Sequence, residues 1–197
     1  MGKELFEISS IDKHDTDVLE FSHNSNGSHE KHLLINSRAK SLCSELVDKI
    51  EPNMHVDFCT AGELSIFQLV QYALTVTGPA DLYLSTWTIK EDPARSLIQL
   101  KEKGTIKNLY GIFDQRIKTL DAGHFHLIET GMTKFALTKN HAKVVVIEGK
   151  ELSLCIVSSA NFSNNPRIEA GFISTINSTV KFHKQWMKQV LAGKTIY

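Results

Sequence analysis

The chain has 197 residues, 42% of them hydrophobic, which is enough for one domain with a buried core. Lysines and arginines number 22, as do aspartates and glutamates, so the overall charge gives no indication of nucleic-acid binding. The 3 cysteines, Cys43, Cys59 and Cys155, are too few and too scattered for a disulfide framework or a zinc site. This composition excludes a disulfide-rich secreted protein and favours a reducing, cytoplasmic compartment.

No segment approaches the roughly twenty consecutive apolar residues of a transmembrane helix. Residues 1–15 lack the apolar core of a signal peptide. We therefore expect a cytoplasmic protein without stable membrane association.

Residues 1–36 are expected to form an N-terminal extension, followed by one domain over residues 37–197. In the extension, short strands are predicted over 5–9 and 18–22. The segment 21–32 is polar, contains glycine and serine, and is rich in histidine. A flexible loop is favoured there over a metal site, because a polar segment cannot bury enough apolar surface to become ordered.

Strands and helices alternate over residues 37–197. Asp92 before Pro93 indicates the start of one helix, and Gly78 and Pro79 indicate the end of another. Strands are predicted over 54–59, 81–89, 106–113, 144–147, 152–157 and 168–176, and helices over 37–50, 63–77, 92–104, 114–130 and 179–192. This alternation predicts an α/β fold in which a mixed β-sheet is flanked by helices on both faces.

Polar side chains with catalytic chemistry lie at both ends of the predicted hairpin 144–157. His141 and Lys143 precede its first strand, and Ser159 and Asn161 follow its second strand. Residues two apart in an extended chain point to the same side, so the hairpin would bring all four together on one face. An imidazole can act as nucleophile and proton carrier near neutral pH, while an ammonium, a hydroxyl and an amide can hold phosphate oxygens.

The charge around this segment is uneven. No acidic residue occurs between Glu129 and Glu148, where the basic side chains are Lys134, Lys139, His141 and Lys143. This local excess of positive charge favours an anionic substrate. His124 and His126 are two residues apart in a predicted helix and face different sides, so we expect no metal site there.

The pattern resembles the HKD signature of the phospholipase D superfamily, His-x-Lys-x(4)-Asp followed downstream by Gly-Ser-x-Asn. Residues 141–143 and 159–161 match it, while Glu148 stands at the aspartate position and Ser158 at the glycine position. In superfamily members a further downstream acid commonly supports the catalytic histidine. Glu169 is the residue best placed for that role here.

The resemblance covers nearly the whole chain beyond residue 37 and implies one phospholipase D-like repeat. It implies a phosphodiester hydrolase that needs no metal or cofactor, in which His141 forms a phosphohistidine intermediate. Lys143, Ser159 and Asn161 would hold the phosphate oxygens of the substrate, and Glu169 would orient the imidazole. Because the reaction needs two imidazoles and the chain has one motif, we expect a homodimer with a composite active site.

The resemblance leaves the substrate open, because the same constellation cleaves lipids, nucleic acids and other diesters. Short chains with one motif resemble bacterial endonucleases more than two-motif phospholipases, so a DNA or RNA endonuclease is favoured and nucleic acid is the expected partner. One alternative is a phospholipid or small-molecule phosphodiesterase. Another is a non-catalytic nucleic-acid-binding module of the same fold, against which the intact His141, Lys143 and Asn161 count.

Overall fold

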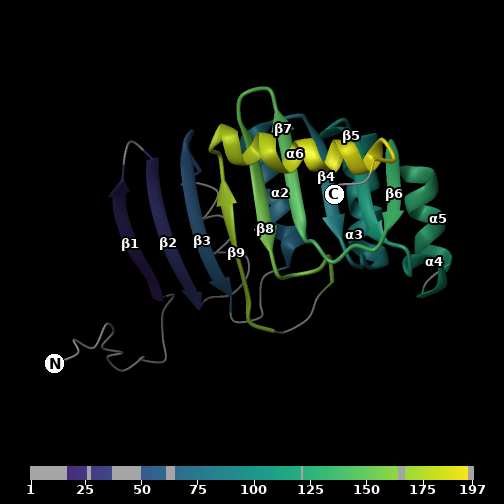
Figure 1. The fold of residues 1–197 in the computed structure, drawn as a ribbon, viewed down its shortest axis with the longest axis horizontal. Coiled ribbons are helices and arrows are strands. Elements are labelled where there is room, and N and C mark those ends of the chain that lie inside the picture. The colour runs from purple at the N-terminus through teal and green to yellow at the C-terminus, as the bar shows by residue number, and fades with distance from the viewer. Residues whose placement is uncertain are drawn as a thin grey trace.

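The strands of the protein join into one sheet. The computed structural model describes residues 17–25, 28–36, 50–60, 65–120, 122–163 and 167–194. Its strands are β1 (Asp17–Ser25), β2 (Ser28–Asn36), β3 (Met54–Thr60), β4 (Ala80–Thr86), β5 (Ile106–Asp114), β6 (Lys134–Thr138), β7 (Val144–Gly149), β8 (Ser153–Ser158) and β9 (Glu169–Ser174). They form a 9-stranded sheet in the order β1-β2-β3-β9-β8-β7-β4-β5-β6 (Figure 1). The sheet is mixed, as predicted, because β2–β3, β4–β5 and β5–β6 are parallel and the other pairs antiparallel.

Helices cover both faces of this sheet, which confirms the predicted fold class. They are α2 (Ile66–Thr77), α3 (Glu91–Glu102), α4 (Ile117–Leu120), α5 (Ala122–Gly131) and α6 (Asn177–Leu191). Figure 1 shows α6 crossing in front of the sheet, with α2 and α3 behind it. None of the helices in the described ranges is long and apolar enough to cross a membrane.

The central strands β7 and β8 supply side chains to both faces, which explains their nearly continuous apolar sequence. Val145 and Ile156 pack in the core beneath α2 and α3, whereas Val146 and Cys155 pack beneath α6 with Met187. Alternate residues of a strand point to opposite sides, so a strand buried on both faces needs an apolar residue at each position. The antiparallel pairing of β7 with β8 confirms the predicted hairpin.

Several predicted element boundaries are wrong for local reasons. The helix α3 begins at Glu91 and its cap is Lys90, so Asp92 lies inside the first turn, where a carboxylate favours the positive end of the helix dipole. The predicted helix 114–130 starts too early, because β5 continues to Asp114 and pairs there with β6. No strand was predicted over residues 134–138, which form the edge strand β6.

The N-terminal part differs most from the expectation. The strand predicted over 18–22 is confirmed by β1, but the polar loop expected over 21–32 is wrong, since β1 and β2 form an antiparallel pair through most of it. The dipeptide Asn26-Gly27 between them is typical of two-residue hairpin connections and could have indicated this pairing. Because β2 pairs with β3, the extension continues the sheet of the remaining chain. The predicted strand 5–9 lies outside the described residues, as does the predicted helix 37–50 except for Ile50.

Gly171 sets the close approach of β8 and β9, which carries Ser159 and Glu169 into the site described below. A Cβ atom at this position would meet the carbonyl oxygen of Val157 and lie 2.8 Å from Ser158 Cα. We expect Gly171→Ala to lower the free energy of unfolding by about 1–3 kcal/mol, because backbone atoms cannot move aside. Chemical denaturation of this variant and of Ala170→Ser, an exposed neighbour, checks the expectation; equal stabilities would contradict it.

Candidate active site

The predicted catalytic residues meet where four strands begin or end at one edge of the sheet. The start of β7 is paired with the end of β8 on one side and with the end of β4 on the other, through Val144, Val157 and Ser85. The backbone N–H of Ser158 donates to the carbonyl of Lys143 at 3.0 Å, which extends the pairing beyond the strand. Segments far apart in sequence therefore deliver their polar side chains to a single place.

His141 and Lys143 are in direct contact. The Lys143 ammonium lies 3.0 Å from Nδ1 and 3.1 Å from Nε2 of His141, and it donates to the His141 carbonyl at 2.8 Å. Nearly equal distances to the two nitrogens place the ammonium against the ring face. Both residues lie in the loop before β7, which begins at Val144 as predicted.

The two residues differ in exposure. His141 is exposed, whereas only 8% of Lys143 is accessible. Burial lowers the pKa of Lys143, and the nearby Glu169 carboxylate acts in the opposite direction. A partly desolvated ammonium interacts more strongly with an anion than one in water, so Lys143 is suited to stabilise negative charge beside an accessible imidazole.

Ser159, Asn161 and Glu169 lie on the adjoining segments. The Ser159 hydroxyl donates to the Glu169 carboxylate and accepts from the Ala170 N–H at 3.1 Å. The Asn161 Oδ1 accepts from the Thr86 hydroxyl at 3.3 Å, which leaves its amide nitrogen as the donor end. Glu169 therefore accepts a hydrogen bond from Ser159, and its negative charge acts to raise the pKa of Lys143. Its role as partner of His141 stays a prediction.

Asn140 holds the loop that carries His141, and the sequence analysis did not identify it. Its side-chain nitrogen lies 3.0 Å from the Ser85 hydroxyl, 3.1 Å from the Thr86 carbonyl and 3.0 Å from the Ile112 carbonyl. Its Oδ1 accepts from the Ala142 N–H at 3.1 Å. One buried amide therefore links β4, β5 and the loop before β7.

Asp114, Arg116 and Trp87 form a second group that the sequence did not reveal. The Asp114 carboxylate accepts from Arg116 Nε at 2.6 Å, from the Arg116 N–H at 3.1 Å and from the Asn140 N–H at 3.2 Å. These bonds, chiefly that of the guanidinium, lower the pKa of Asp114 to about 2. The guanidinium lies 5.2 Å from the ring centre of Trp87, and Trp87 lies 6.5 Å from the His141 ring.

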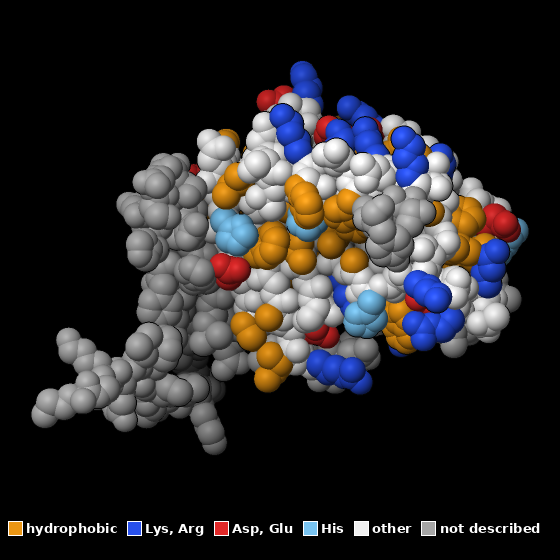
Figure 2. Space-filling view, in the orientation of Figure 1, with side chains coloured by type: hydrophobic (Ala, Val, Ile, Leu, Met, Phe, Trp, Pro, Cys, Tyr) orange, Lys and Arg blue, Asp and Glu red, His pale blue; other side chains and the backbone are white. Residues whose placement is uncertain are grey.

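The site is flanked by two hollows that share Lys139, Asn140 and His141. One, of about 460 Å³, is lined by Asp114, Gln115, Arg116, Lys139, Asn140 and His141. The other, of about 590 Å³, runs towards α6 and includes Leu137, Trp186 and Val190. Figure 2 shows basic side chains gathered at the edge over α6 and apolar side chains exposed beside them.

The two departures from the HKD pattern have local partners. Glu148, at the aspartate position, lies near the opposite end of β7 and forms an ion pair with Lys184 of α6. Ser158, at the glycine position, accepts from the Ala160 N–H at 3.0 Å and so shapes the turn that follows β8. Neither change removes a group from the His141 site. In the described part of the chain, no three His, Cys, Asp or Glu side chains are grouped for metal binding.

Solved structures share this fold at low sequence identity. No family model and no curated protein sequence matches the chain. NucT from Helicobacter pylori is similar over 62% of this chain and 87% of its own, with 17% identity and a TM-score of 0.50. A polyphosphate kinase from Porphyromonas gingivalis is similar over 80% of this chain and 28% of its own, with 13% identity and a TM-score of 0.55. A phospholipase D family member, Nuc from Salmonella typhimurium, covers 64% of this chain and 90% of its own with 12% identity and a TM-score of 0.48.

The likenesses to NucT and to the polyphosphate kinase show a shared fold. The chain has a phospholipase D-like fold, as its motif predicted. Residues 141–143 and 159–161 meet at one sheet edge of that fold.

The central place of Asn140 can be tested by a nearly isosteric change. Asn140→Asp replaces the amide donor that faces the Thr86 and Ile112 carbonyls with a carboxylate that repels them. We expect the free energy of unfolding at neutral pH to fall by about 1–3 kcal/mol or more, the cost of unsatisfied buried groups. The exposed Asn177→Asp is the control, with an expected change below about 0.5 kcal/mol. Similar denaturation curves for both variants would refute a structural role of the Asn140 amide.

Proposed function

We propose that the protein is a phosphodiester hydrolase that works without a metal through a phosphohistidine on His141, and that its substrate is nucleic acid. The observation that carries this proposal is the contact between the buried Lys143 ammonium and the exposed His141 imidazole. A nucleophile open to solvent with a desolvated cation at its side is suited to attack on a phosphodiester. The phospholipase D-like fold supports this assignment.

The reaction has two displacements at phosphorus. A ring nitrogen of His141 attacks, the new N–P bond forms as the P–O bond to the leaving group breaks, and a second imidazole protonates the departing oxygen. That imidazole then takes a proton from water, and the hydroxide breaks the N–P bond to release a phosphomonoester. Lys143, with Asn161 and Ser159, binds the remaining phosphate oxygens in both steps. Glu169 orients the His141 imidazole.

The second imidazole is proposed to be His141 of another copy of the chain. The HKD pattern occurs once in the sequence, at 141–148, and His141 is exposed at the sheet edge where a twofold partner could approach it. In a C2 dimer the same residue faces its mate across the axis, so identical side chains take the roles of nucleophile and acid. The active unit is accordingly a homodimer.

Nucleic acid is favoured by the cations next to His141. Arg116 and Lys139 line the hollow beside it, as expected for a substrate with repeated phosphates. A phospholipid substrate is the second candidate, supported by the apolar wall of the other hollow and by Phe182 of α6, which is 65% exposed. Purified protein with EDTA, assayed on single- and double-stranded DNA, RNA and phosphatidylcholine vesicles, decides between them.

His141→Ala is expected to remove hydrolysis by several orders of magnitude, because it deletes nucleophile and acid together. Turnover of the unmodified protein should persist in EDTA, and rapid quenching should trap an acid-labile, base-stable phosphate on His141. His126→Ala, at an exposed histidine of α5, is the matched control and should keep full activity. Loss of cleavage on chelation, restored by magnesium, would instead indicate a metal-activated water.

The composite site predicts a specific response to mixing. When wild-type protein exchanges subunits with His141→Ala protein, mixed dimers hold one imidazole and lose activity. Activity should therefore follow the square of the wild-type fraction, falling to about one quarter in an equal mixture. Light scattering and sedimentation of the wild type should show a dimer. A linear decline, to about one half, or a fully active monomer would rule out the shared site.

A further inference from the structure

The two hollows beside His141 differ in chemistry. The hollow towards α6 has an apolar wall that includes Leu137, Trp186 and Val190. The hollow on the other side has Arg116 and Lys139 on its lining and no apolar side chain. Lys139 lines both hollows and Lys194 lines the one towards α6, so the feature found only in the other hollow is the Arg116 guanidinium beside Asp114.

The Arg116 guanidinium is held in place with its outer edge open. Its Nε donates to Asp114 at 2.6 Å, and its Cζ atom lies over the Trp87 ring, 5.2 Å from the ring centre. Its two terminal amino groups form no hydrogen bond with the residues that the structure describes. A guanidinium fixed by a carboxylate and an aromatic ring loses little conformational entropy on binding, and its free fork suits two phosphate oxygens.

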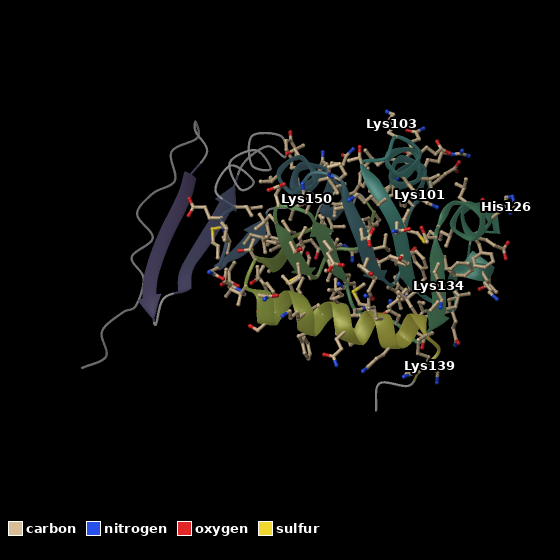
Figure 3. The ribbon with its side chains drawn as sticks, turned by 90° about the horizontal axis from the view of Figure 1, so that it is seen from above. Lys101, Lys103, His126, Lys134, Lys139 and Lys150 are labelled. Carbon is tan, nitrogen blue, oxygen red and sulfur yellow. The ribbon has the colours of Figure 1, made fainter. Side chains whose placement is uncertain are left out.

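The Asp114 carboxylate is ionised and balances the charge of Arg116, but it occupies the Nε edge of the guanidinium. It is only 4% exposed, and its two oxygens accept hydrogen bonds from Arg116 and from the Asn140 N–H. Lys139 adds a second cation, because it is exposed and forms no ion pair within the described ranges. Figure 3 shows Lys139 at the α6 side of the molecule, with Lys103 far away at the opposite side.

We propose that the hollow between Arg116, Lys139 and His141 binds a second phosphate group, adjacent to the scissile one along a nucleic-acid strand. This inference rests on the proposed function. The Arg116 fork and the Lys139 ammonium contact the flanking phosphate, and Trp87 and Asp114 position the guanidinium. The substrate is thus selected for a neighbouring phosphate, a group that a diester with one isolated phosphate lacks.

The test separates binding of the flanking phosphate from cleavage. Three dinucleotides with an uncharged methylphosphonate linkage, carrying no terminal phosphate, a 5′-phosphate or a 3′-phosphate, are titrated calorimetrically in EDTA. We expect one of the terminal phosphates to lower the Kd roughly tenfold or more for the wild type, the size of a charge-assisted hydrogen bond. This gain should disappear in Arg116→Gln and in Lys139→Gln, and remain in Lys103→Gln, which removes one distant charge.

Two further variants and assays make the outcome unambiguous. Arg116→Lys keeps the charge but lacks the fork, so it should restore only part of the gain. If Arg116→Gln does not fold, Arg116→Lys carries the test, because Lys139 lines both hollows. A wild type that gains nothing from either phosphate, or a gain that survives in Lys139→Gln and in folded Arg116→Gln, overturns the subsite. Hydrolysis of an ordinary dinucleoside monophosphate by the wild type tests the proposed function separately, because the subsite is not needed for it.

Discussion

The hydrogen bonds of the Asn140 side chain are the constraint on which the candidate site depends. They join the Thr86 and Ile112 carbonyls and the loop that carries His141, and the Asn140 N–H reaches the Asp114 carboxylate. A buried amide is costly unless its polar atoms are paired, so the loop has one arrangement that satisfies them. That arrangement places an exposed imidazole at the edge of a rigid sheet, where a substrate can reach it.

The sheet also explains why Lys143 is buried and His141 is exposed. β7 and β8 are buried on both faces of the sheet. Lys143 directly precedes β7 and lies at the edge of this core, whereas His141 is exposed to solvent. The imidazole is accessible, and the cation beside it is partly desolvated, which strengthens its interaction with an anion. On the outer side, Asp114 binds the Arg116 guanidinium through its Nε, and the guanidinium lies over the Trp87 ring. Fixed polar groups at the site therefore rest on buried partners.

The phospholipase D-like fold is retained here with little sequence identity to the solved structures that share it. Of the two departures from the HKD pattern, Glu148 pairs with Lys184 outside the site, whereas Ser158 bonds the Ala160 N–H in the turn that carries Ser159 and Asn161. A low sequence identity is compatible with a shared fold, because the core needs only apolar residues of suitable volume on the two faces of the sheet. The motif side chains depend on strand register, which the hairpin of β7 and β8 maintains.

The sequence by itself determined the α/β alternation and the hairpin, because these follow from local periodicity, and its short motif spacings pointed to the five residues proposed for the site. Three features were decided only by the tertiary structure. The parallel pairing of β4 with β5 brings Trp87 and Arg116 to one place although they are distant in sequence. The pairing of β2 with β3 makes the N-terminal hairpin part of the main sheet. The role of Asn140 depends on carbonyls of two other strands, and no local pattern records which backbone groups remain unpaired at a strand end.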